Sequence, residues 1–382
     1  MLAMASCTSI DPTSRPTTLL NGLAASPLKS KLQSCATGPF KRTDFSIAHR
    51  GAPLGYPEHT RQGYLAAAAM GAGVIECDVT FTKDLALVCR HSQCDLHRTT
   101  NILQTKLARQ CTSNFTPATA DKAANANCCT TDITLEEFRS LCGRRDIVDA
   151  AADNVDDYLT APTSPLVSDP VQCGTLMTHA ESIDLFDKLG TGFTPELKSA
   201  AVAMPFHGMT QQDYASRMLN EYVTRGIAAE RVRPQSFILQ DILYWIDQHP
   251  DFAAHAVYLD PRGRQPDFQV SLEDMQRLYN AGVTTIAPPM AMLLELDASG
   301  KLQPTNYARY AKAAGLNIIT WTFESGVATD PNNWLYANLP GFMDNESKML
   351  EVLHVLQSEV GITGIFSDWP GTVTYYANCF DL

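Results

Sequence analysis

Short apolar runs alternate with amphipathic stretches along most of this chain, and this alternation restricts the fold more than any other feature. The apolar runs predict strands at 45–49, 73–79, 85–90, 192–198, 236–240, 255–260, 283–288, 316–323 and 364–368. Stretches with helical periodicity lie between many of them, at 58–71, 134–142, 180–189, 211–226, 271–281, 305–314 and 346–359. Strands that alternate with helices form right-handed crossovers and a parallel sheet. About eight such units predict an α/β fold, a (β/α)8 TIM barrel. No G-x-G-x-x-G motif follows the first strand, which argues against a dinucleotide-binding sheet.

Two parts of the chain interrupt the alternation. Residues 1–40 are rich in Ser, Thr, Pro and Gly, which predicts an irregular N-terminal arm. Residues 101–131 are polar, contain three cysteines and lack a clear period, which predicts a cysteine-rich loop insertion after the third strand. The rest of 41–382 is expected to form one barrel domain, without a second domain or an internal repeat.

The cysteine content bears on the compartment. Eleven cysteines are many for a cytosolic enzyme and favour an oxidising environment. Disulfides are expected in the region between Cys94 and Cys173, whereas Cys77 and Cys89 lie in apolar strands and are expected to be buried free thiols. Two N-x-S/T sequons begin at Asn114 and Asn345. No signal peptide is visible, so a secreted, periplasmic or cell-surface location is inferred from the cysteines and sequons alone.

Charge and hydropathy exclude two classes of partner. The net charge of −12 argues against general nucleic-acid binding, which needs a basic face. No apolar run is long enough to span a bilayer, so stable membrane insertion is not expected. The oligomeric state is left open by the sequence.

Ionisable residues gather where the predicted strands end. In a barrel of this kind, functional residues lie at the C-terminal ends of the strands. There the first four predicted strands place His49 and Arg50, Glu76 and Asp78, His91, and Glu196 and Lys198, respectively. We therefore expect these side chains to meet at one rim.

The E-x-D pair of the second strand suggests a metal site. Glu76 and Asp78 point to the same face because strand side chains alternate. Two buried carboxylates repel each other unless a cation lies between them, and a hard divalent cation suits oxygen ligands. Glu196 could add a third carboxylate, and Lys198 could meet an anionic substrate. The alternative interpretation is a salt-bridge network at the strand ends.

The two strand-end histidines suggest acid–base chemistry. His49 and His91 flank the carboxylates, as expected of a general acid and a general base that work near neutral pH. The Arg50 guanidinium suits phosphate oxygens, and Gly51 permits a sharp turn close to a ligand. Most of the other histidines, including His59, are expected to be surface or packing residues.

Taken together, the motifs resemble those of the glycerophosphodiester phosphodiesterases. They are HRG at 49–51, PEHT at 57–60, E-x-D at 76–78, TKD at 82–84, H-S-x-x-x-L-x-R-T-T at 91–100, ELK at 196–198, WTF at 321–323 and GIFSDWP at 364–370. The resemblance runs in order from about residue 45 to 376. It implies a TIM barrel, one divalent cation (Ca²⁺ or Mg²⁺) and a small-molecule glycerophosphodiester substrate that is hydrolysed to sn-glycerol 3-phosphate and an alcohol.

The resemblance also implies roles for individual residues. By position, the metal ligands are Glu76, Asp78 and Glu196, and the acid–base pair is His49 and His91. The implied substrate-binding residues are Arg50 and Lys198 at the phosphate, Glu58, expected to orient the first histidine and the glycerol hydroxyls, and Trp321 in the pocket wall.

The sequence departs from the family pattern at two positions, and two other kinds of function are left open. The family usually has Asn where His59 stands and Asp where Ser92 stands. A lysophospholipase D or a sphingomyelinase D-like enzyme would use the same barrel and chemistry with room for a lipid tail. A non-catalytic phosphate- or glycan-binding protein would keep the fold without turnover.

Overall fold

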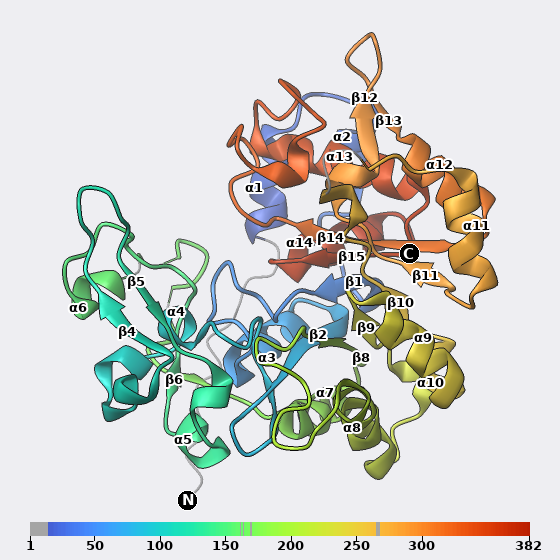
Figure 1. Ribbon diagram of the computed structural model, residues 1–382. Helices are drawn as coiled ribbons and strands as arrows, with labels where there is room; N and C mark the ends of the chain where they lie inside the picture. Colours follow the sequence, from blue (N-terminus) through green and yellow to red (C-terminus); the bar gives the residue numbers. More distant parts are fainter. Residues whose placement is uncertain (1–13, 161, 163, 169, 265–267) are drawn as a thin grey trace, which may run out of the picture.

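Eight parallel strands close into a barrel in the computed structural model, which describes residues 14–160, 162, 164–168, 170–264 and 268–382 (Figure 1). The first strand pairs with both the second and the last, which closes the ring. The barrel strands are β1 (Thr43–Ala48), β2 (Ala72–Phe81), β8 (Gly192–Leu197), β9 (Gln235–Ser236), β10 (Val257–Tyr258), β11 (Thr285–Ile286), β14 (Asn317–Phe323) and β15 (Gly364–Ser367). The TIM-barrel prediction is therefore confirmed.

Helices cover the outside of the barrel. They are α3 (Arg61–Ala69), α7 (His179–Leu189), α8 (Gln211–Thr224), α9 (Leu239–Gln248), α10 (Pro250–Ala253), α11 (Leu272–Asn280), α12 (Asn306–Ala313), α13 (Met349–Val355) and α14 (Pro370–Cys379). Reciprocal capping boxes start three of them, at Thr178, Thr210 and Ser271. The sequence pattern did not predict α9. The apolar run 236–240, which predicted a strand, spans the end of the two-residue strand β9 and the start of this helix.

The third apolar run is not a parallel barrel strand, which corrects the expected strand order. β3 (Leu87–Cys89) pairs antiparallel with β2, with Val79 opposite Cys89. β2 is ten residues long. After β2 the chain reverses direction, so that β3 runs back along the end of β2 next to the rim. The parallel neighbour of β2 on this side is β8, in which Glu196 lies opposite Asp78.

Cys77 and Cys89 form a disulfide, so the expectation that both are free thiols is wrong. They lie on the paired strands β2 and β3, with their Cα atoms 5.3 Å apart. An apolar strand pattern predicts burial of both side chains correctly, but it does not show which cysteines face each other.

Residues 92–176, which we call the insertion lobe, form a small structured unit between β3 and α7. Its elements are α4 (Leu96–Thr99), β4 (Ser113–Thr116), β5 (Asn125–Asn127), α5 (Leu135–Arg139), β6 (Cys142–Gly143), α6 (Val155–Tyr158), β7 (Gly174–Thr175) and three 3-10 turns, at Ile102–Gln104, Lys106–Gln110 and Thr130–Asp132. It packs a core of its own around residues such as Leu96, Ile102, Phe138 and Tyr158. Figure 1 shows it projecting from one side of the barrel. The expected loop insertion at 101–131 is thus part of a larger, folded lobe.

Three disulfides staple this lobe and confirm the expected cross-linking between Cys94 and Cys173. They join Cys94 to Cys129, Cys111 to Cys128 and Cys142 to Cys173. The two ends of the lobe leave the barrel side by side, since the Cys89 amide donates to the Met177 carbonyl at 3.0 Å. The lobe is therefore inserted at a single point of the barrel.

The N-terminal segment is not irregular where the structure describes it, contrary to the expectation for residues 1–40. α1 (Ser14–Gly22) and α2 (Pro27–Ser34) pack Leu19, Leu20 and Leu32 into the main core. Their short length hides the helical period in a Ser- and Thr-rich sequence. Cys35 follows α2 and is bonded to Cys379 at the end of α14. Residues 1–13, with the eleventh cysteine, Cys7, lie outside the described residues.

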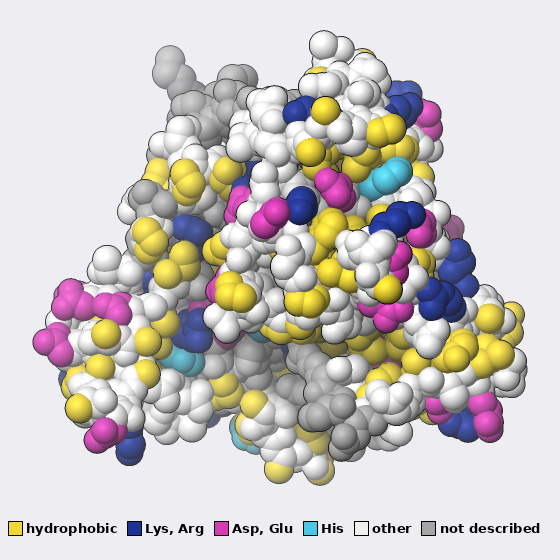
Figure 2. Space-filling view, turned by 90° about the horizontal axis from the view of Figure 1, so that it is seen from above, with side chains coloured by type: hydrophobic (Ala, Val, Ile, Leu, Met, Phe, Trp, Pro, Cys, Tyr) yellow, Lys and Arg dark blue, Asp and Glu magenta, His cyan; other side chains and the backbone are white. Residues whose placement is uncertain are grey.

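Surface charge is mixed on the face that Figure 2 shows. Acidic, basic and apolar side chains are interspersed there, without a continuous basic patch among the coloured residues. Among the described helices, none combines the length and the apolar character that a membrane span requires.

Candidate active site

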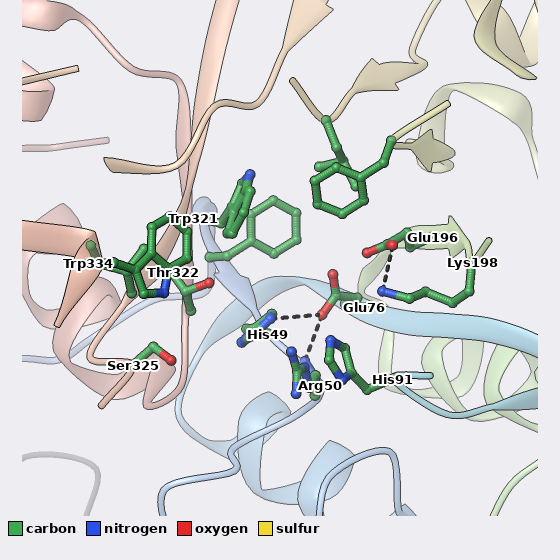
Figure 3. Close-up of a pocket in the computed structure, with 14 residues that line it drawn as sticks. His49, Arg50, Glu76, His91, Glu196, Lys198, Trp321, Thr322, Ser325 and Trp334 are labelled. Atoms are coloured by element: carbon green, nitrogen blue, oxygen red, sulfur yellow. Dashed lines mark hydrogen bonds and ion pairs between the residues drawn. The ribbon is translucent and has the colours of Figure 1, made fainter. Parts of the chain in front are cut away.

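A cavity of about 380 Å³ opens at the C-terminal rim of the barrel (Figure 3). One side is charged and consists of His49, Arg50, Glu76, His91, Glu196 and Lys198. The other side is mostly apolar, with Phe237, Leu259, Trp321, Thr322, Ser325, Trp334, Leu335 and Phe366. The structure thus brings most of the sequence-predicted site residues to one place.

Three carboxylates meet beside this cavity. Glu76 and Asp78 project from β2, and Glu196 projects from the position of β8 directly opposite Asp78. All three are buried, and one oxygen of each lies within 4.8 Å of the others. The E-x-D spacing and the neighbouring strand together produce this cluster.

The electrostatics of the cluster call for a further positive charge. Burial, Asp78 and Glu196 raise the pKa of Glu76 well above its ordinary value. Burial raises the pKa of Glu196 to about 8, although Lys198 opposes the shift. Asp78 Oδ1 is buried and has no hydrogen-bond partner among the described residues, although Lys198 Nζ lies 3.9 Å from it. Hard oxygen donors with an orphaned oxygen among them fit a divalent cation.

Two donors hold Glu76 in place. The Arg50 amide donates to Oε2 at 2.9 Å, and the Gln235 side chain donates to Oε1 at 2.9 Å. Gln235 begins β9 and lies opposite Glu196 in the ladder. Sequence reasoning missed it because a single amide at a strand start gives no pattern.

His49 is oriented by Asp368, a residue that the sequence motif contained without an assigned role. Its Nδ1 lies 2.5 Å from Asp368 Oδ1, and its Nε2 lies 4.0 Å from Glu76 Oε2. A carboxylate on one ring nitrogen fixes the tautomer and the orientation of the ring. Glu58, which was expected to orient His49, contacts Arg50 and Arg90 instead, so this expectation is corrected.

His91 reaches the site through the β3 return and not from a parallel strand. Figure 3 shows the His49 and His91 rings on either side of Arg50, below Glu76. Burial, with Arg50 and Lys198 nearby, holds the pKa of His91 well below its ordinary value. At neutral pH its ring is therefore uncharged in this environment.

Two cations line the charged side. Lys198 Nζ lies 2.6 Å from Glu196 Oε1, and Arg50 Nη1 lies 3.2 Å from Glu58 Oε2. The corner that presents Arg50 requires glycine at position 51, where φ is +96° and an added Cβ would lie 2.9 Å from the Gly63 carbonyl carbon.

His59 is a buried partner of the carboxylate cluster, whereas the sequence suggested a surface or packing role. Its Nε2 lies 2.9 Å from Asp78 Oδ2, and its Nδ1 lies 2.9 Å from the Tyr64 hydroxyl. The imidazole thereby fixes one oxygen of Asp78.

The apolar side of the cavity is an aromatic wall. The Trp321 indole donates to the Ala287 carbonyl at 2.8 Å. Its ring meets Phe237 and Trp334 edge to face, each with centroids 5.6 Å apart. Trp334 was not predicted, since it lies in an irregular segment before β15.

The chain is similar in sequence to known proteins. The sequence profile of the Glycerophosphoryl diester phosphodiesterase family matches residues 49–372. A protein from Arthroderma benhamiae, named only Extracellular protein, is 37% identical over 216 residues, which cover 55% of this chain and 88% of that protein.

Solved structures share the fold. A protein from Silicibacter pomeroyi DSS-3, provisionally named a glycerophosphoryl diester phosphodiesterase, aligns with a TM-score of 0.58 and 20% identity, over 88% of this chain and 93% of that one. An Oleispira antarctica phosphodiesterase, solved in complex with the product sn-glycerol-3-phosphate, aligns with a TM-score of 0.52 and 17% identity, over 88% and 96% of the two chains. At these identities the likeness supports the fold alone.

Proposed function

Because this chain belongs to the glycerophosphoryl diester phosphodiesterase family, we propose that it hydrolyses glycerophosphodiesters to sn-glycerol 3-phosphate and an alcohol. The observation that carries the proposal is the cluster of Glu76, Asp78 and Glu196 at a rim that also presents two histidines and Arg50. The product bound to the Oleispira antarctica phosphodiesterase supports the same substrate class.

The three carboxylates are the proposed ligands of one divalent cation, Ca²⁺ or Mg²⁺. When bound, such a cation draws charge from the phosphate oxygens and stabilises the transition state. Arg50 grips the phosphate oxygens with its guanidinium, and Lys198 adds a second positive charge on the same side of the cavity. His59 and Gln235 hold the carboxylates in position.

His49 and His91 are the proposed acid–base pair. One imidazole takes the proton from the nucleophile, a water molecule or the neighbouring glycerol hydroxyl. The other gives a proton to the departing alcohol, so that no free alkoxide forms. Asp368 holds the His49 ring in its orientation through the contact at Nδ1.

The proposed location is extracellular. Five disulfides join ten of the cysteines within the described residues, and such bonds persist in oxidising compartments. The Arthroderma benhamiae relative is named an extracellular protein.

A panel of glycerophosphodiesters tests the activity. The protein is incubated with glycerophosphocholine, glycerophosphoethanolamine and glycerophosphoglycerol in Ca²⁺, Mg²⁺ or excess chelator, and released sn-glycerol 3-phosphate is assayed. We expect turnover with at least one diester and one cation. If no diester is hydrolysed under any condition, the proposed function is wrong, and the non-catalytic alternative gains support.

A lipid substrate is the second candidate, because one wall of the cavity is aromatic and Trp334 is 43% exposed. A lysophospholipase D or sphingomyelinase D-like enzyme would lay an acyl chain along this wall. Comparing glycerophosphocholine with lysophosphatidylcholine distinguishes the two. A higher kcat/KM for lysophosphatidylcholine would favour the lipid substrate.

A further inference from the structure

A fully buried guanidinium, that of Arg90, lies behind the rim and does not line the cavity. Arg90 precedes His91 on the chain and has no solvent-exposed surface. Its Nη2 donates to the Glu58 carbonyl at 3.1 Å and to Glu58 Oε1 at 3.3 Å. Its Nε and Nη1 have no hydrogen-bond partner among the described residues. A buried cation is costly unless it is paired, so its neighbours matter.

Arg90 belongs to a row of four alternating charges. Glu58 contacts Arg50 through Oε2, at 3.2 Å, and Arg90 through Oε1. On the other side, Arg90 Nε lies 3.8 Å from Asp95 Oδ1. The row therefore runs Arg50, Glu58, Arg90, Asp95, from the cavity into the protein. Burial alone would raise the pKa of Glu58, but Arg50 and Arg90 outweigh it and keep the carboxyl ionised.

The last charge of the row comes from the insertion lobe. Asp95 lies just before α4, yet its side chain does not cap that helix. Its Oδ2 accepts from the Ser92 amide at 3.0 Å, and its Oδ1 accepts from the Thr99 hydroxyl at 3.3 Å. Asp95 therefore pairs with Arg90 and also fixes the turn that follows His91.

The row is neutral without an added ion. Glu58, His91 and Asp95 have ligand atoms within 4.8 Å of one another, which by itself resembles a metal site. Two guanidiniums already balance the two carboxylates, however, and Arg90 reaches both of them. A second metal ion would have to compete with this buried cation.

We propose that Arg90 and Asp95 are positioning residues that act through Glu58 to hold the Arg50 guanidinium at the phosphate, so that the insertion lobe completes the active site. The inference rests on the proposed function, in which Arg50 binds the phosphate of the substrate. Glu58 is shared between two cations, so its carboxylate stays in place only while Arg90 does. Asp95 holds Arg90 beside Glu58, because it supplies a second negative charge while the Glu58 carboxylate is shared between Arg50 and Arg90.

Asp95→Asn is the main test, because it removes the charge and keeps the size and hydrogen-bonding oxygen of the side chain. We expect KM for a glycerophosphodiester to rise on the order of tenfold to a hundredfold, with a smaller change in kcat, because a misplaced phosphate group is held less well. The inhibition constant of inorganic phosphate should rise in parallel. Asp146→Asn is the matched control: it removes a carboxylate of the same lobe that pairs with Arg98 at 2.7 Å on the surface. It should leave both constants unchanged.

A double variant separates positioning from loss of fold. Arg90→Gln with Asp95→Asn removes both buried charges, so no unpaired ion remains, and we expect it to fold even if Asp95→Asn alone does not. Its KM should rise by no more than that of the worse single variant, since coupled residues are not additive. Independent, multiplying effects of the two substitutions would overturn the proposal.

Phosphate binding distinguishes failure of this inference from failure of the proposed function. The dissociation constant of inorganic phosphate is measured by calorimetry on the wild type, Asp95→Asn and Asp146→Asn. Weaker binding in Asp95→Asn alone supports the positioning role, even if no diester is turned over. Equal binding in all three proteins, or equal KM where turnover exists, overturns it.

Discussion

The barrel and the insertion lobe are stabilised in different ways. The barrel buries a large apolar core between its strands and its helices of up to 14 residues, and a second apolar cluster on its strands. The lobe has helices and strands of only two to five residues, a small separate core and three disulfides. Small units bury too little apolar surface to be stable on their own, and disulfides supply the additional stability. The barrel also carries the residues of the proposed chemistry, whereas the lobe contributes the buried charge of Asp95, which lies behind the cavity.

Removal of the proposed divalent cation should have the largest effect, and this effect concerns the barrel. Without a counter-charge, the carboxylates of Glu76, Asp78 and Glu196 repel one another and the phosphate is not polarised. We expect release of sn-glycerol 3-phosphate to fall to background in excess chelator and to return with Ca²⁺ or Mg²⁺. Full activity in excess chelator would refute the three-carboxylate site.

Loss of either proposed catalytic histidine should have the next largest effect. His49→Ala and His91→Ala should each lower kcat by about a hundredfold or more, because each removes a proton-transfer group. His207→Ala is the control, since that ring stacks on Phe206 and does not line the cavity. Both variants should melt at the wild-type temperature. Near-normal kcat in either one would show that the barrel rim is not the catalytic centre.

Breaking a lobe disulfide should affect stability more than chemistry. Cys142→Ser with Cys173→Ser opens a link between residues 31 positions apart, which corresponds to about 4 kcal/mol in the loop-entropy model. We expect hydrogen exchange and limited proteolysis to increase within 92–176 and to stay unchanged in the barrel strands. If the barrel strands lose protection equally, the two regions unfold as one unit and the contrast between them is wrong.

The smallest of these effects is a pH dependence of the free energy of unfolding, which arises from Glu324 in the barrel. Burial raises the pKa of Glu324 to about 7, although Arg15 opposes the shift. Because the folded pKa exceeds the ordinary value of 4.5, this group contributes stability that is complete below pH 4.5 and is lost as the pH rises through about 7. A rise from 4.5 to about 7 corresponds to roughly 3 kcal/mol. Glu324→Gln should flatten this part of the unfolding free energy profile, measured by urea denaturation from pH 4.5 to 7.5. An unchanged slope would assign the pH dependence to other groups.

Much of the barrel and of the carboxylate cluster was predictable from the sequence. Strand periodicity marks the barrel strands, and period-two spacing places Glu76 and Asp78 on one face. Adjacent parallel strands then bring Glu196 beside them. These features are local in sequence or follow from regular topology, so a pattern can reveal them.

The unpredicted features depend on contacts that no pattern contains. The direction of β3 is not encoded in its apolar residues, because a parallel and an antiparallel strand bury the same side chains. Asp368 and Gln235 act on residues far away in the sequence, and the pairing of Arg90 with Asp95 depends on the turn between them. Cysteine partners are likewise set by three-dimensional proximity alone.

The Cys35–Cys379 bond makes the molecule a covalent ring of nearly its whole length. Its two ends, α2 and α14, are joined across 344 positions. A protease that cuts one exposed loop anywhere between them opens the backbone but releases no fragment, since both pieces stay tethered through sulfur. In the proposed extracellular location, a single nick by a protease would leave the barrel strands at high local concentration and able to close again.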